Sequence, residues 1–178
     1  YNGQRCTALK ILFVHESIAD QFLGRFVPAV EALTSGMPWE PGVRITPLPV
    51  PGKPQQMADW IADAVAKGAR VLNRNGGTVH GTYCHPAVVY PVSPDTELYH
   101  HEQFGPVVPV APYRDIDEVI SYIRESCYGQ QASIFGSDPQ LLAELIDPLA
   151  NQVCRINLNS QCQRGPDSFP FAGRKDSA

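Results

Sequence analysis

A cysteine in a glycine-containing turn is the first residue of this sequence whose chemistry stands out. Cys6 closes the stretch NGQRC, residues 2–6, and Arg5 precedes it directly. A thiolate is a strong nucleophile, and neighbouring cations or backbone N–H groups lower the pKa of the thiol. Free cysteines are also common as small buried hydrophobes. The stretch alone therefore leaves a catalytic and a structural interpretation open.

Two later stretches combine residue types that suit ligand binding. Glu102 and Phe104 stand two positions apart before a Gly-Pro turn. An acid and a ring so placed can hold a ribose hydroxyl and the face of a flat ligand, although a strand-entry turn with a solvated glutamate is the better explanation of the stretch taken by itself. Residues 163–173 are too rich in glycine, proline and aromatics for a regular element. Ordered loops of this kind often carry function.

Composition bounds the class of protein. The chain has 178 residues, 43% hydrophobic and 18% charged, which suits one globular domain. A net charge of −4 without a basic stripe argues against nucleic acid, and the apolar runs are too short to span a membrane. Five cysteines without a CxxC pair indicate a reducing, cytoplasmic setting. Because the chain does not start with Met, we expect both ends to be cuts within a longer protein.

The elements that must position these residues alternate along the chain. Apolar periodicity and capping residues predict helices that begin at Ser17, near residue 55, at Asp115 and at Asp138. We expect Pro28 to kink or divide the first helix, and Gly68 and Gly129 to close the second and third. The predicted strands are residues 11–14, 70–72, 83–92, 107–111, 131–135 and 152–158. This order predicts an α/β fold, a largely parallel sheet with helices on both faces.

Four motifs in order resemble the catalytic domain of the aldehyde dehydrogenase superfamily. They are NGQRC at residues 2–6, HEQFGPV at 101–107, RINLN at 155–159 and FPFAGRKDS at 169–177. The resemblance covers residues 1–178. GQRCTA and RGPDSFPF are most similar to the branch of NADP-dependent, non-phosphorylating glyceraldehyde-3-phosphate dehydrogenases. The resemblance implies that residues 1–178 form one aldehyde dehydrogenase-like catalytic domain, a fragment from which the cofactor-binding domain is absent.

The resemblance also implies a role for each matching residue. Cys6 would be the catalytic nucleophile, which attacks the aldehyde to give a thiohemiacetal and then a thioester. Arg5 and Arg164 would bind the phosphate of the substrate, as guanidinium groups do well. The remaining residues implied are Glu102 and Phe104 for the cofactor, Phe171 for the substrate, and Gln4 and Asn157 as active-site support.

The implied function is oxidation of an aldehyde, glyceraldehyde 3-phosphate in that branch, to the acid with NADP or NAD. In the family the general base, the oxyanion amide and the dinucleotide-binding fold precede the nucleophile, and no GxGxxG loop occurs in this sequence. We therefore expect the chain alone to bind cofactor poorly and not to turn over. The expected partners are the aldehyde, the chain's own upstream cofactor-binding domain and, at full length, a second copy of the protein.

Three alternatives stay open. The first is a general NAD(P)-dependent aldehyde dehydrogenase for non-phosphorylated aldehydes. The second is a zinc-binding module, although the ligand types present lack the paired spacing of such sites, and we expect no metal. The third is a cysteine hydrolase in which Cys6 pairs with a histidine. The zinc candidates are His80, Cys84, His85, His100 and His101.

Overall fold

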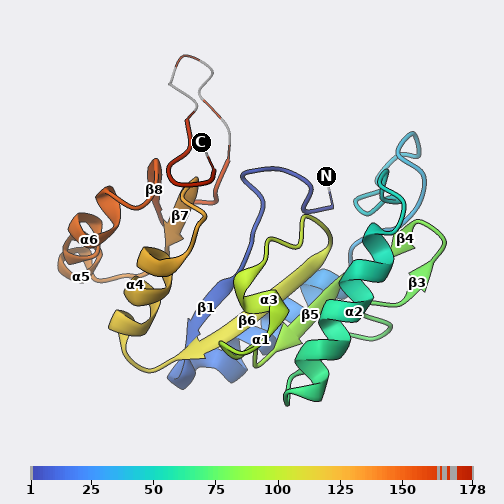
Figure 1. The fold of residues 1–178 in the computed structure, drawn as a ribbon, viewed down its shortest axis with the longest axis horizontal. Helices are drawn as coiled ribbons and strands as arrows, with labels where there is room; N and C mark the ends of the chain where they lie inside the picture. Colours follow the sequence, from blue (N-terminus) through green and yellow to red (C-terminus); the bar gives the residue numbers. More distant parts are fainter. Residues whose placement is uncertain (1, 164, 166–167, 169–171, 178) are drawn as a thin grey trace. The chain divides into compact units, whose positions relative to one another are not determined.

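The chain folds into two units (Figure 1). The computed structural model describes residues 2–163, 165, 168 and 172–177. Unit 1 is made of Tyr1–Arg5 and Leu9–Arg114, and unit 2 of Cys6–Ala8 and Asp115–Ala178. Along the chain, Arg5 and Leu9 belong to unit 1, whereas the three residues between them, which include Cys6, belong to unit 2.

Unit 1 is built on a four-stranded sheet in the order β1-β6-β5-β2. The bounds are β1 Leu12–His15, β2 Arg70–Val71, β5 Ala87–Tyr90 and β6 Val107–Tyr113. The pairs β1–β6 and β5–β6 are parallel, with Leu12 opposite Val110 and Ala87 opposite Val107, and β2 is antiparallel to β5. The predicted α/β fold with a largely parallel sheet is confirmed.

Helices cover both faces of this sheet, as Figure 1 shows. Helix α1 (Glu16–Glu31) packs on one face, and α2 (Lys53–Ala66) with α3 (Glu97–His100) packs on the other. Strand β5 shows the division, because Val88 joins the cluster under α1 while Ala87 and Val89 join the cluster under α2. Alternate residues of a strand point to opposite faces of the sheet. Because helices cover both faces of β5, every residue of this strand is apolar or aromatic.

The helix boundaries of unit 1 correct one expectation and narrow another. His15, not Ser17, is the N-cap of α1, because its ring accepts a hydrogen bond from the backbone N–H of Ser17. Pro28 lies inside α1, so of the two expected effects, a kink or a division, the division does not occur. Helix α2 ends as predicted, with Lys67 as C-cap and Gly68 at a φ of 100°.

Two short elements of unit 1, β3 (Val79–His80) and α3, were not predicted. Strands β3 and β4 (Tyr83–Cys84) form a hairpin, and the predicted strand over residues 83–92 is divided between β4 and β5. Pro86, which cannot donate to a ladder, lies at that division. Helix α3 is a single turn too short to give a periodic pattern.

Unit 2 contains a parallel pair, β7 (Gln131–Ile134) with β8 (Arg155–Leu158), and helices α4 (Ile116–Glu125), α5 (Pro139–Glu144) and α6 (Ile146–Ala150). The capping box of Asp115 and Glu118 is confirmed. The single helix expected after Asp138 is two short helices. Among the described residues, no helix is long and apolar enough to cross a membrane.

Gly129 does not close α4, which ends four residues earlier at Glu125. Its structural role is a close backbone approach, since a Cβ there would lie 2.5 Å from the carbonyl oxygen of Gln152 and 2.8 Å from that of Arg174. Gly129 is therefore required by packing within unit 2 and not by a helix end.

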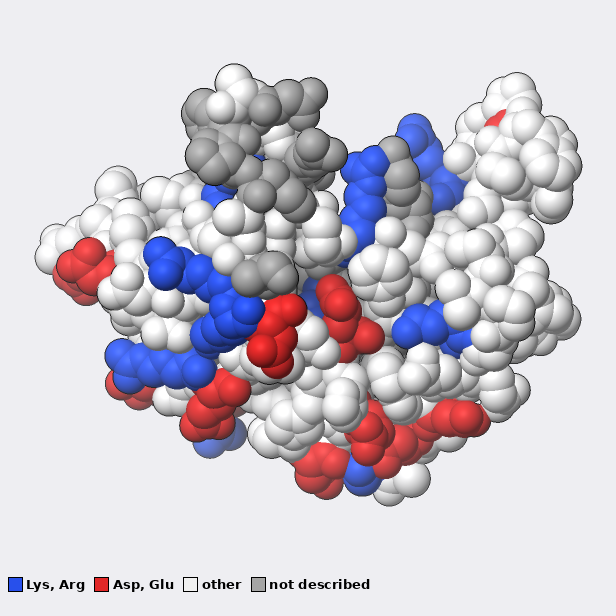
Figure 2. Space-filling view, turned by 45° about the horizontal axis from the view of Figure 1, so that its top comes forward, with Lys and Arg blue, Asp and Glu red and all other residues white. Residues whose placement is uncertain are grey.

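Charged side chains of opposite sign lie close together on the face shown in Figure 2. Ion pairs join Arg114 to Glu16 at 2.6 Å and Lys67 to Asp63 at 2.6 Å. The face in Figure 2 therefore mixes both signs of charge, and its described part does not form the continuous basic stripe that binding to a phosphate backbone requires.

Candidate active site

The loop that carries Cys6 is fastened to unit 1 at its first residues. Asn2 is buried, and its side-chain amide exchanges hydrogen bonds with Thr46: Nδ2 donates to the Thr46 carbonyl at 2.8 Å, and Oδ1 accepts from the Thr46 N–H at 3.0 Å. Gly3 follows with a φ of 72°, and a Cβ on it would lie 2.4 Å from the carbonyl oxygen of Gly105. Only glycine fits that approach without displacing backbone.

The same loop is fastened to unit 1 again after Cys6. The Gln103 side chain donates from Nε2 to the carbonyl of Leu9 at 2.9 Å. The Lys10 ammonium donates to the carbonyls of Leu98 and Tyr99, at 3.1 and 2.6 Å. Residues on both sides of Cys6 are thus held to unit 1, and the contacts at Gly105, Gln103, Leu98 and Tyr99 all involve residues 98–105.

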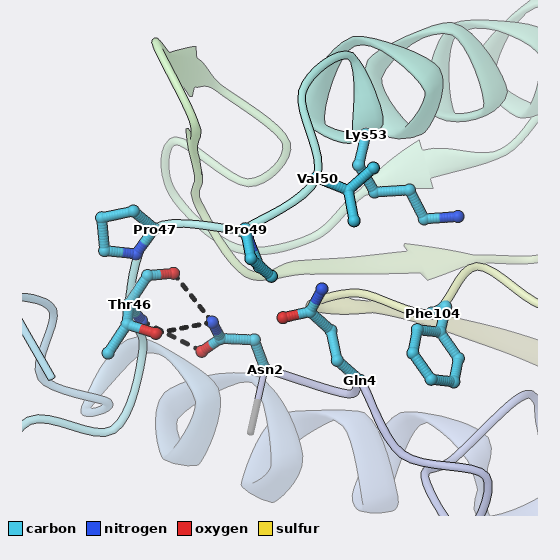
Figure 3. Close-up of a pocket in the computed structure, with 8 residues that line it drawn as sticks. All are labelled: Asn2, Gln4, Thr46, Pro47, Pro49, Val50, Lys53 and Phe104. Carbon is cyan, nitrogen blue, oxygen red and sulfur yellow. Dashed lines mark hydrogen bonds between the residues drawn. The ribbon is translucent and has the colours of Figure 1, made fainter.

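A pocket of about 510 Å³ opens in unit 1 beside the start of this loop (Figure 3). Gln4 projects into it between Pro49 and Phe104. The volume lies within the roughly 300–1,000 Å³ typical of sites for small ligands. Of the eight lining residues, Lys53 alone carries a charge. They are Asn2, Gln4, Thr46, Pro47, Pro49, Val50, Lys53 and Phe104.

Glu102 and Lys53 perturb each other's pKa. Burial raises the pKa of the Glu102 carboxyl above its ordinary value, and the positive charges of Lys53 and Lys10 offset part of that rise. Burial lowers the pKa of Lys53, and the charge of Glu102 offsets part of that fall. Lys53 also donates to Gln56 at 2.9 Å and lies 5.7 Å from the ring centroid of Trp60. An acid and a base with opposed shifts beside a pocket are typical of a functional site.

Gln103 lies between the two predicted cofactor residues and is 1% exposed. Its Nε2 also donates to the carbonyl of Val107 at 2.7 Å, whereas its Oε1 has no hydrogen-bond partner among the described residues. Two such bonds contribute about 1 kcal/mol each, and an unpartnered buried polar atom costs about 1–3 kcal/mol. The amide therefore adds little net stability over an apolar side chain of its size, and its contribution is geometric.

In unit 2, Cys6 is exposed to solvent. Asn157 lies on β8, where its Nδ2 donates to the Oε1 of Gln131 and to the carbonyl of Ala132, both at 3.2 Å, and lies 3.7 Å from the Sγ of Cys162. Asn157 therefore connects the two strands of unit 2 to the loop that follows β8.

The structure brings some of the predicted site residues together. Gln4 and Phe104 line one pocket, and Glu102 interacts electrostatically with Lys53 of the same pocket. Arg5 is exposed in unit 1, and Cys6 and Asn157 belong to unit 2. The remaining two, Arg164 and Phe171, lie outside the described residues.

Sequence reasoning missed Asn2, Lys10, Lys53 and Gln103 as members of this region. Their partners are up to 94 positions away, so no local pattern indicates them. The one available signal was the unusual left-handed turn that Asn-Gly favours, since Asn2 and Gly3 both have positive φ.

Among the other thiols and imidazoles, Cys84, His100 and His101 have structural surroundings. Burial raises the pKa of Cys84 to about 11, so its thiol is un-ionised and unreactive at neutral pH. His100 contacts the carbonyl of Pro94, and His101 pairs with Glu97 and stacks on Trp60. No three His, Cys, Asp or Glu side chains of the described residues cluster as a metal site would require.

Comparison with known proteins gives one family over the full length. The family model for the aldehyde dehydrogenase family matches residues 1–178. The NADP-dependent glyceraldehyde-3-phosphate dehydrogenase of Streptococcus equinus is 36% identical over 99% of this chain and 36% of its own length. The sulfoacetaldehyde dehydrogenase of Neptuniibacter caesariensis is 31% identical over 98% of this chain and 38% of its own length.

Solved structures agree with the sequence comparisons. The NADP-dependent glyceraldehyde-3-phosphate dehydrogenase of Bacillus halodurans, complexed with NADP, superposes with a TM-score of 0.92 at 38% identity, over 99% of this chain and 36% of that one. Aldehyde dehydrogenase 21 of Physcomitrella patens, in complex with the product succinate, gives 0.89 at 32% identity, over the same shares. This chain spans little more than a third of the length of such relatives. The chain belongs to the aldehyde dehydrogenase family.

Proposed function

We propose that this chain is the nucleophile-bearing part of an NADP-dependent dehydrogenase that oxidises a short anionic aldehyde, glyceraldehyde 3-phosphate in the first instance, to the acid. The observation that carries the proposal is the match over the whole chain to relatives of that name. All five cysteines are free thiols, which suits the cytoplasm as the place of reaction.

Cys6 supplies the nucleophile. Its thiolate adds to the aldehyde carbon and gives a thiohemiacetal, and loss of hydride converts this to a thioester that water hydrolyses to the acid. The backbone N–H groups of Arg5, Cys6 and Thr7 are the nearest donors along the chain for the oxyanion. Fastening on both sides of Cys6 limits the movement of this loop, and such preorganisation is what acyl chemistry demands.

A bound NADP would supply the hydride acceptor. The residues that would hold its nicotinamide end are Glu102, whose carboxylate accepts hydrogen bonds from ribose hydroxyls, and Phe104, whose ring lines the pocket. The pocket fits such a group, because it combines one aromatic wall, the amide of Gln4 and a half-buried carboxyl nearby.

The substrate class follows from charge. Arg5 is exposed next to Cys6, and we assign to it and Arg164 the anionic end of the aldehyde, since guanidinium groups bind oxyanions in a bidentate manner. Relatives named for sulfoacetaldehyde and for 3-sulfolactaldehyde are 31% and 30% identical to this chain. A sulfonated aldehyde is therefore the second candidate, and an uncharged aldehyde the third.

The test measures reduced-nicotinamide absorbance in the full-length protein with glyceraldehyde 3-phosphate, 3-sulfolactaldehyde and propanal. Cys6→Ser should lower kcat by roughly 10⁴-fold or more, as loss of a nucleophile does. Arg164→Leu should raise KM for the two anionic aldehydes and leave propanal unchanged. Equal rates on all three substrates, unaffected by Arg164→Leu, would remove the substrate assignment and leave a general aldehyde dehydrogenase.

Thiol alkylation tests the nucleophile, and the requirement for a nicotinamide separates a dehydrogenase from a hydrolase. Iodoacetamide should modify Cys6 and inactivate the enzyme, while Cys84 stays unmodified in the folded protein because its thiol is un-ionised. A cysteine hydrolase would cleave esters but form no reduced nicotinamide from an aldehyde, so ester hydrolysis by a protein that reduces no NADP with any of the three aldehydes would reject the proposal.

A further inference from the structure

We propose that Gln103 is a positioning residue that holds Leu9, the residue at which the chain returns to unit 1 after Cys6, to the segment carrying Glu102 and Phe104. The inference rests on the proposed function, in which those segments supply nucleophile and cofactor ligands. It adds a residue whose side chain reaches neither the substrate nor the pocket and acts through the backbone that it holds.

The hydrogen bonds of the amide define this role. Nε2 donates to Leu9, three positions after Cys6, and to Val107, the first residue of β6. Both partners are carbonyl oxygens, so the nitrogen must face them and the amide cannot be reversed. With 1% exposure, the side chain is protected from water that would compete for these bonds. One side chain thereby connects the exit of the nucleophile loop to the strand that follows the cofactor segment.

The backbone that follows Gln103 needs a contact that holds it in place. Phe104 adopts a φ of 47°, which is unfavourable for a residue with a Cβ. Gly105 follows in contact with Met57, where a Cβ would lie 1.7 Å from the methyl carbon. The turn at Phe104 and Gly105 is therefore strained and tightly packed. It holds Glu102 and Phe104 in the positions that cofactor binding requires only while other contacts keep its backbone in place.

Removal of the amide should loosen the loop without detaching it. Lys10 holds its own contacts to Leu98 and Tyr99, and Asn2 holds Thr46, so the Cys6 loop remains fastened at other points. The expected result is a displacement of small size. Displacements of about 1 Å can cost about 100-fold in rate, so activity should change more than stability.

The experiment compares three variants of the full-length protein. Gln103→Met removes the amide and keeps the volume. Gln103→Glu places a carboxyl there, which can donate to one carbonyl only when protonated. Gln130→Met is the matched control, because Gln130 is also buried, at 8% exposure, with an Oε1 that has no partner among the described residues, but it belongs to unit 2.

We expect Gln103→Met to lower kcat by about 10- to 100-fold and to change the rate of Cys6 alkylation by iodoacetamide. Gln130→Met should keep both near the parent values. Gln103→Glu should be as slow as Gln103→Met at high pH and recover part of its kcat, relative to the parent at the same pH, as pH falls. An amide that served only to stabilise the fold would give the recovery only over the pH range in which Gln103→Glu unfolds, so kcat is compared where circular dichroism shows the variant to be folded.

Parent values of kcat and alkylation rate in Gln103→Met, or losses equal to those of Gln130→Met, would overturn the inference. Should Gln103→Met fail to fold, the pH recovery of Gln103→Glu decides alone, and its absence rejects the role. If Cys6→Ser retains activity, the proposed function fails. The alkylation rate of Cys6 does not depend on turnover, so it still tests the role of Gln103 in that case.

Discussion

Glu102 illustrates how much a single residue depends on its neighbours. Its carboxyl has a raised pKa because of burial, and Lys53 and Lys10 restrain that rise. Cofactor binding by a carboxylate should therefore weaken as pH falls through a value above the ordinary 4.5. Lys53→Met removes one restraining charge, so the acid limb of the pH profile for cofactor affinity should move to higher pH.

The measurement is the Kd of NADP against pH for the parent, Lys53→Met and Glu102→Gln, the last of which should have no such limb. An acid limb that stays in place in Lys53→Met would contradict the coupling.

The raised pKa of Glu102 also affects the stability of the fold. A raised folded pKa means that Glu102 contributes stability at low pH that is lost as pH rises through that pKa. Glu102→Gln should therefore gain stability relative to the parent as pH increases.

At the scale of elements, α4 ends in a way that no local pattern indicates. The ammonium of Lys175 donates to the carbonyls of Ile123, Arg124 and Ser126, at 2.5, 3.2 and 2.8 Å. These are the unpaired carbonyls of a helix C-terminus. Lys175→Met should lower the free energy of unfolding by about 1–3 kcal/mol, because it leaves partly buried carbonyls without a donor.

Denaturant unfolding of the parent and Lys175→Met checks this, with Lys67→Met as control. Lys67 lies in an exposed ion pair with Asp63, and such pairs contribute little. Equal effects of the two substitutions would show that the contacts of Lys175 to the helix end add nothing beyond a surface charge.

Elements specified by neighbouring residues could be predicted from the sequence, and those specified by distant ones could not. The capping box at Asp115 and the end of α2 at Gly68 involve residues within one turn, and both were predicted correctly. The roles of Gly129 and Lys175 depend on chain segments 23 and more positions away, as the contact of Gly129 with Gln152 shows. The same holds for the proposed site, where motifs indicate Cys6, Glu102 and Phe104, whereas Gln103 is indicated only by its contacts.

At the scale of the molecule, the chain spans 36% of the length of the Streptococcus relative. The pocket in unit 1 has eight lining residues, with a single charged side chain among them. Such a pocket can accommodate the nicotinamide end of a dinucleotide. The pyrophosphate and adenosine need further hydrogen-bond donors and apolar surface. We propose that an upstream cofactor-binding domain supplies these, and that the full-length protein associates with a second copy of itself.

NADP should therefore bind the isolated chain only weakly, with a Kd above about 1 mM, since few contacts must offset the cost of immobilising the whole dinucleotide. Calorimetric titration of residues 1–178 measures it, and nicotinamide mononucleotide is the matched ligand. Because the mononucleotide retains the part that unit 1 can contact, it should bind about as well as NADP itself. Binding of NADP at micromolar concentration, lost in Glu102→Gln, would show instead that this chain holds a complete cofactor site, and the assignment of the remaining contacts to another domain would be wrong.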